Sequence, residues 1–125
     1  MEQELGRLPD AELEIMQVLW SLERYPAYTD EIAAGLNRDW KAPTLLKLLS
    51  RLEKRGFVRE EKQGHRNGYT PLVEEQAYLQ VEGRSFLQRL CGGSMGKLIA
   101  SLYPQVQLTQ EDLEALEAIL HKEGK

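Results

Sequence analysis

Residues 43–56 read PTLLKLLSRLEKRG and predict an amphipathic helix. Pro43 suits the first turn, where its missing N–H costs no hydrogen bond, and Gly56 is the glycine that commonly follows the last turn. Four leucines have the i, i+3, i+4, i+7 spacing of a stripe that faces a core: Leu45, Leu48, Leu49 and Leu52. The opposite face carries hydroxyls and cations: Thr44, Lys47, Ser50, Arg51 and Lys54.

This helix lies in the basic part of an acidic chain. Nine of the 16 lysines and arginines, but only four of the 20 acidic residues, fall in residues 38–66, while the whole chain has a net charge of −4. Positive charge gathered on an ordered element is typical of a surface that binds nucleic acid. An ordinary solvated face is the better explanation of one polar helix taken in isolation, so the neighbouring segments decide between the two interpretations.

The segments on both sides predict a winged helix. Upstream, Thr29 is expected to cap a short helix with Asp30 and Glu31 in its first turn. Its inward residues would be Ile32, Ala33 and Leu36, and residues 37–42 would form the turn of a helix-turn-helix. Downstream, residues 57–63 and 69–73 predict two strands around a turn at 64–68. Arg66, with His65, would lie at the tip of this wing, along the DNA backbone or minor groove.

A further helix is expected before this unit, from Leu8-Pro9-Asp10 through Leu22. Its closely spaced acids Asp10, Glu12 and Glu14 suit a cap and the positive end of a helix dipole, which explains them better than catalysis or metal binding.

Composition excludes several classes of protein. With 125 residues the chain has room for one domain and an appendage. No stretch is apolar enough to span a membrane and no signal peptide precedes Leu5, so we expect a cytoplasmic protein. A single cysteine, Cys91, excludes an internal disulfide, and the two histidines lack metal-ligand spacing. No catalytic or cofactor motif is present, so we expect no enzyme, metal or cofactor.

The sequence changes character after residue 73. Helices are predicted over 74–90, from a cap at Ser94 to Tyr103, and from a capping box at Thr109. Their shared core is too small to fold alone, which favours a homodimer over the alternative that they fold back on the winged helix. The expected dimer contacts are Leu98, Leu102, Leu113, Leu116 and Leu120. The predicted fold is therefore mainly α with a small β-hairpin wing: a winged helix-turn-helix over 1–73, followed by a helical dimerisation domain over 74–125.

Three segments resemble the penicillinase-repressor (BlaI/MecI/CopY) family. They are LPDAELEIM at 8–16 with Leu19-Trp20, WKAPTL at 40–45 continued by LLSRLEKRGF at 48–57, and LTQEDLEAL at 108–116. The resemblance implies a homodimeric bacterial repressor on dyad-symmetric operators ahead of resistance genes. In the β-lactam branch a membrane metalloprotease sensor leads to cleavage of the repressor, and the corresponding bond here is Ser101–Leu102.

The chain departs from the family's pattern at a few positions. Lys41 stands where a capping serine is typical, Lys47 where threonine is common, and Leu46 where many relatives are polar. The bond Ser101–Leu102 replaces an Asn-Phe bond. The copper-responsive branch ends in a cysteine-rich tail, which this chain lacks.

These observations predict a dimeric repressor that binds a double-stranded DNA operator. Lys47 and Arg51 would reach base edges or adjacent phosphates, and Thr44 and Ser50 would supply hydroxyl contacts. Lys41, Lys54 and Arg66 would hold phosphates. The alternative is a winged-helix module that binds protein and not DNA.

Overall fold

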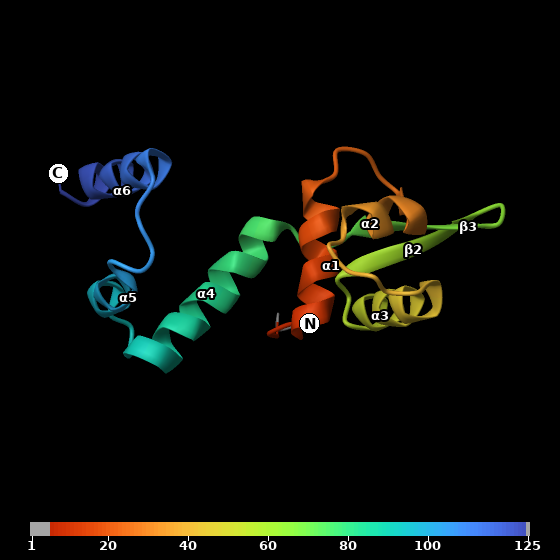
Figure 1. Cartoon of the computed structure of the whole chain (residues 1–125), viewed down its shortest axis with the longest axis horizontal. Helices are drawn as coiled ribbons and strands as arrows, with labels where there is room; N and C mark the ends of the chain where they lie inside the picture. Colours follow the sequence, from red (N-terminus) through yellow and green to blue (C-terminus); the bar gives the residue numbers. More distant parts are fainter. Residues whose placement is uncertain (1–5, 125) are drawn as a thin grey trace. The chain divides into compact units, whose positions relative to one another are not determined.

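The computed structural model describes residues 6–124, and within them helices predominate (Figure 1). The elements are α1 (Asp10–Ser21), β1 (Ala27–Tyr28), α2 (Thr29–Gly35), α3 (Ala42–Lys54), β2 (Val58–Gln63), β3 (Arg66–Pro71), α4 (Glu75–Cys91), α5 (Met95–Leu102) and α6 (Gln110–Glu123). None of the helices in the described range is both long and apolar enough to cross a bilayer. Two compact units, residues 1–85 and 86–125, divide the chain within α4. The boundary expected from the sequence, after residue 73, stays a prediction.

The core of the first unit forms where α1, α2, α3 and the sheet meet. The leucine stripe of α3 is buried there as predicted, together with Ile15, Met16 and Leu19 of α1 and Ile32 of α2. Burial of these side chains stabilises the unit by roughly 1.5–3 kcal/mol each. Burial of the apolar face therefore fixes the rotation of α3 about its own axis, and its polar face must point to solvent.

The first turn of α4 belongs to this unit. Tyr78 is 1% exposed, and its hydroxyl accepts a hydrogen bond of 3.0 Å from the backbone N–H of Leu8. Its ring lies 5.8 Å from the rings of Trp20 and Phe57, measured between centroids. Tyr78 therefore ties the start of α4 to the winged helix.

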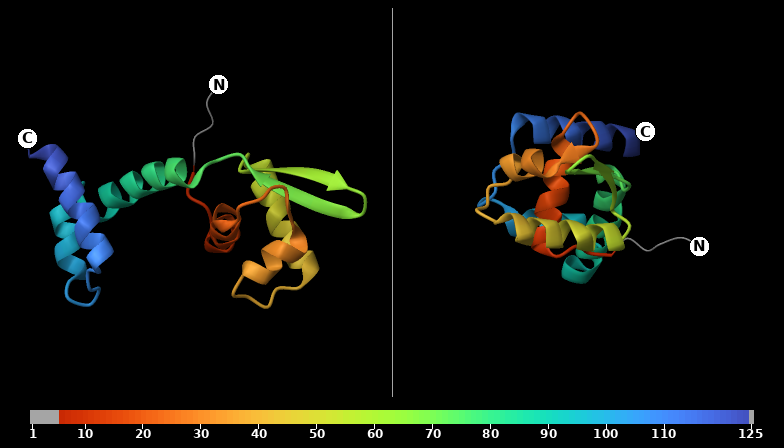
Figure 2. Two further views of the ribbon diagram at one scale, coloured as in Figure 1. Left: turned by 90° about the horizontal axis from the view of Figure 1, so that it is seen from above. Right: turned by 90° about the vertical axis from the view of Figure 1, so that its right-hand side faces the viewer.

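The sheet is antiparallel, with strand order β1-β3-β2. β2 and β3 form a hairpin in which Gln63 pairs with Arg66, so only Gly64 and His65 form the turn. Gly64 has φ +65°, a conformation that glycine adopts without strain. The hairpin is the wing, which lies beside α3 in the left view of Figure 2.

The second unit contains the end of α4 together with α5 and α6. Ser94 caps α5 by accepting a hydrogen bond of 3.0 Å from the N–H of Lys97. Thr109 and Asp112 form the predicted capping box of α6, with bonds of 3.0 and 2.9 Å. Among residues 86–124, Cys91 is the only side chain that is buried.

Several local predictions were wrong. Thr29 is the first residue of α2 and not its cap, and Ala33 is exposed. Asp10 is likewise the first residue of α1, after Pro9, and caps nothing. The wing turn is shorter than expected, so Arg66 lies in β3 and not at the tip. The strand β1 was not foreseen, because two residues form a strand only through their partner.

Candidate nucleic-acid interface

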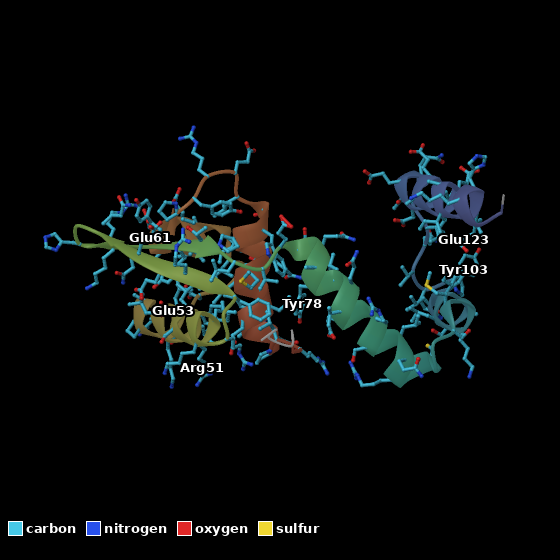
Figure 3. All side chains as sticks on the ribbon, turned by 180° about the vertical axis from the view of Figure 1, so that it is seen from behind. Arg51, Glu53, Glu61, Tyr78, Tyr103 and Glu123 are labelled. Carbon is cyan, nitrogen blue, oxygen red and sulfur yellow. The ribbon has the colours of Figure 1, made fainter. Side chains whose placement is uncertain are left out.

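The outer face of α3 is the first part of the candidate interface. Its five predicted residues, Thr44, Lys47, Ser50, Arg51 and Lys54, are all exposed. Figure 3 shows Arg51 pointing away from the sheet. Lys41 stands at the N-cap, where its side chain makes no capping bond and is exposed. The structure thus brings six of the seven predicted DNA contacts to one exposed helix and its first turn.

The end of α3 is held by an ion pair between an exposed arginine and a buried carboxylate. Nε of Arg55 donates a hydrogen bond of 2.7 Å to Glu12 of α1, whose side chain is only 1% exposed. A buried carboxylate requires such a partner, because an unpaired charge inside a protein is costly. Arg55 therefore has a structural role in the fold, although it lies within the basic segment.

A second arginine pairs with α1 from the turn before α3. The guanidinium of Arg38 donates hydrogen bonds of 2.9 and 2.6 Å to the two carboxylate oxygens of Glu14. These bonds lower the pKa of Glu14 below its usual value. The guanidinium also lies 5.7 Å from the ring centroid of Trp40. Arg38 thereby links the turn to α1 through Glu14, and its contact with Trp40 lies within the turn itself.

Arg66 is held against the start of α2. Its guanidinium lies 3.8 Å from the ring centroid of Tyr28 and donates a hydrogen bond of 3.0 Å to Asp30. This bond is the largest cause that lowers the pKa of the Asp30 carboxyl. Arg66, predicted to hold phosphate from the wing tip, is thus engaged within the protein.

The cations that stay available can now be separated from those that are paired. Within residues 6–124, six cations of the basic segment have no carboxylate at ion-pair distance: Lys41, Lys47, Arg51, Lys54, Arg59 and Lys62. The last two lie on β2 and are exposed. Sequence reasoning did not select them as contacts, although both were part of the basic segment. The three arginines with acidic partners could not be identified from the sequence, because each acid lies 24 to 43 residues away.

The second candidate surface is apolar and lies on α5 and α6. Of the five predicted dimer contacts, Leu102, Leu113 and Leu120 are exposed, whereas Leu98 and Leu116 are partly buried. A cavity of about 70 Å³ opens between α5 and the segment that follows it, lined by Ile99, Leu102, Tyr103, Val106 and Leu108. Such a surface can bind another apolar surface.

The bond between Ser101 and Leu102 lies in the last turn of α5. Both residues are exposed, and the Ser101 hydroxyl donates a hydrogen bond of 2.8 Å to the carbonyl of Leu98. Within the described part of the chain, no three His, Cys, Asp or Glu side chains come close enough together to hold a metal ion.

Known proteins with similar sequence or structure place this geometry in a family. The penicillinase repressor of Bacillus licheniformis is 32% identical over 125 residues, which cover 97% of this chain and 96% of that protein. The methicillin resistance regulatory protein MecI of Mammaliicoccus sciuri is 28% identical, over 98% of this chain and 99% of that protein. The solution structure of the DNA-binding domain of the repressor BlaI is similar, with 32% identity and a TM-score of 0.51. That match covers 62% of this chain and 94% of the solved domain.

The likeness to the solved domain confirms the predicted fold class, mainly helical with a winged helix. The family model described as penicillinase repressor matches residues 8–122. The chain therefore belongs to the penicillinase repressor family, as its sequence motifs predicted.

Proposed function

We propose that the chain is a DNA-binding transcriptional repressor and that it acts as a homodimer on a dyad-symmetric operator of resistance-type genes. The observation that carries this proposal is the outer face of α3, which keeps exposed cations and hydroxyls while nearby arginines are paired with acids. Relatives named as penicillinase and methicillin resistance regulators support the repressor function. The family is one of repressors and not of enzymes, in agreement with the sequence prediction.

The helix has the size and chemistry that a major groove accepts. An α-helix fits this groove, and exposed lysine, arginine, serine and threonine side chains can reach phosphates and base edges. In the helix-turn-helix arrangement the second helix makes these contacts. We therefore assign reading of bases to Lys47 and Arg51, hydroxyl contacts to Thr44 and Ser50, and phosphate contacts to Lys41 and Lys54.

The apolar surface of α5 and α6 supports the homodimer. The exposed leucines of this unit would be removed from water if a second copy covered them, and this removal favours association. A symmetric dimer would present two winged helices to two half-sites, which explains the dyad-symmetric operator. The dimer is thus the element of the proposal that determines operator symmetry.

Release by proteolysis is the remaining part of the proposal. Ser101 and Leu102 are exposed at the end of α5, and cutting between them would separate α6 from the rest of the chain. The released fragment would carry four of the five proposed dimer leucines, Leu102 together with the three of α6. A sensor-linked protease is the partner that this mechanism requires.

Affinity for duplex DNA at a series of salt concentrations tests the proposal. For wild type, log K should fall steeply with log salt, by about 0.9 for each phosphate contacted. Lys54→Ala should weaken binding to all sequences alike and reduce the slope by about one per subunit. Lys97→Ala is the matched control, because this exposed lysine lies on α5 and should leave the slope unchanged.

Two results would count against the proposal. A wild-type chain without measurable affinity for any duplex at low salt would favour the protein-binding winged helix instead. An equal loss of slope in Lys54→Ala and Lys97→Ala would show a general effect of net charge and no defined interface.

A further inference from the structure

The outer face of α3 is not uniformly polar along its length. Its N-terminal part exposes three apolar residues, Ala42, Pro43 and Leu46, beside Thr44 and Lys47. Its C-terminal part exposes only polar and charged residues on this face, Ser50, Arg51 and Lys54. Positions 42, 43 and 46 are neighbours on a helix surface, because residues one turn apart lie above one another. The helix thus carries a small apolar area at its N-terminal end, next to its cations.

Leu46 is the main residue of this apolar area. Its side chain is 38% exposed, while the other leucines of α3 are buried in the core. It precedes Lys47 in sequence and lies one turn before Ser50, so it is bordered by two of the proposed DNA contacts. An isolated exposed leucine on a protein surface is ordinary. Its position on the face proposed to enter DNA calls for a partner group that is itself apolar.

Duplex DNA offers one prominent apolar group in the major groove, the 5-methyl group of thymine. The N-terminal residues of a recognition helix are those that lie closest to base edges. Leu46 belongs to this half of α3, and its branched side chain can cover a methyl group that a polar side chain would leave in water. Lys47 and Arg51, close by, can hold the phosphates or guanines that fix the helix in place.

We infer that Leu46 makes this repressor specific for thymine by packing on the 5-methyl groups of the operator. The inference rests on the proposed function and adds to it a class of base contact that discriminates by shape and not by hydrogen bonding. It assigns the contact with thymine to Leu46 and leaves the charged contacts to the cations of the same face. Uracil differs from thymine only in the missing methyl group. The protein should therefore bind a duplex with uracil at these positions less tightly than one with thymine.

Selection followed by thymine replacement tests the inference. The full-length chain is used to select duplexes from a random library, and each thymine of the selected site is then replaced singly by uracil. At one or two thymines per half-site, uracil should weaken wild-type binding about fourfold, the factor that corresponds to about 0.8 kcal/mol for a buried group of methyl size. In Leu46→Ala the ratio of the two affinities should fall to about one. Leu46→Met, which keeps an apolar side chain of similar volume, should retain the ratio.

Leu72→Ala is the matched control, because Leu72 is an exposed leucine of the same unit that lies outside α3. Its ratio of thymine to uracil affinity should equal that of wild type. Equal affinity of wild type for thymine and uracil at every position would overturn the inference, and so would a ratio that persists in Leu46→Ala. In both cases tight binding to the selected site over random duplex would leave the proposed function intact. Failure to select any duplex would overturn both.

Discussion

Glu12 is a single residue with two structural roles. Its side chain is buried beside the apolar core, and its carboxylate holds Arg55 at the end of α3. Its sequence position, in the acidic first turn of α1, predicted only an interaction with the helix dipole. In the structure its carboxylate is buried and bonded to Arg55, 43 residues later. An acid in the first turn of a helix can face solvent near the helix dipole or form a buried ion pair, and here the packing of α1 on α3 determines that it forms the pair.

Removing Arg55 should destabilise the first unit more than its own exposure suggests. In Arg55→Ala the Glu12 carboxylate would lose its partner while staying buried, so we expect a loss of about 1–3 kcal/mol in the free energy of unfolding. Arg59→Ala, an exposed arginine of β2, is the control and should change stability by less than about 0.5 kcal/mol. Denaturant unfolding measures both. Equal effects would show that the ion pair does not contribute to stability.

Substitution of Lys47 or Arg51 should show whether each residue contacts bases or phosphates. Arg51→Ala and Lys47→Ala are each expected to narrow the gap between operator and random DNA by about 1–3 kcal/mol for a lost base contact. The fold should survive, because both side chains lie opposite the buried leucines. Competition binding with operator and random duplex gives the gap. If a variant binds operator and random duplex more weakly by the same factor, the substituted residue contacts phosphate and does not read bases.

At the scale of elements, helices were predictable where a local signal marks their ends. α3 begins and ends within a residue of the prediction because Pro43 and Gly56 act on their own neighbours. α6 starts at its capping box for the same reason. β1 has no such signal, since its two residues are extended only because they pair with β3. The ion pairs of the three arginines could not be predicted for the same reason, because their acidic partners lie on elements distant in the sequence.

The pair between Asp30 and Arg66 joins two elements, α2 and the wing. Asp30→Asn should release Arg66 and remove one negative charge beside it. We therefore expect tighter binding to random duplex and a salt slope steeper by up to about one per subunit. Glu23→Gln removes an exposed acid that has no ion-pair partner within residues 6–124, in the loop after α1, and is the control for net charge. Weaker binding of Asp30→Asn would mean that the pair positions the wing for DNA and does not restrain it.

The same pair has a defined pH dependence. Because Arg66 lowers the pKa of Asp30 in the folded chain, the pair stabilises the fold above the ordinary pKa of an aspartate. This contribution is lost as the pH falls through the lowered pKa, where the carboxyl is protonated. The stability difference between wild type and Asp30→Asn should thus be present at neutral pH and vanish in acid. Denaturant unfolding at both pH values measures it, and a difference that grows in acid would contradict the assignment.

At the scale of the whole molecule, the two units differ in how much they bury. The first unit has a continuous core, whereas residues 86–124 bury only Cys91. The sequence indicated this contrast through the short amphipathic helices after residue 73. It could not indicate how these exposed side chains are covered in the proposed dimer, because their contacts there would come from a second copy of the chain.

Leu116→Asp tests the proposed dimer. A charge in an apolar interface stays unpaired, so the variant should be monomeric and lose the roughly 10²–10⁴-fold gain that comes from linking two half-site readers. Ala118→Asp adds the same charge on the opposite face of α6 and should stay dimeric. Sedimentation and operator binding are measured together. A monomer that binds a palindromic operator as tightly as wild type would refute the role of the dimer, and so would a Leu116→Asp protein that stays dimeric.

The sparse burial of residues 86–124 has a consequence for gene dosage. If a second copy supplies the missing cover, dimers form in proportion to the square of the chain's concentration while monomers predominate. Halving the number of chains in a dividing cell would then cut the number of dimers to about a quarter. Repression would fade faster than the protein itself, and a modest fall in synthesis would be enough to switch the genes on.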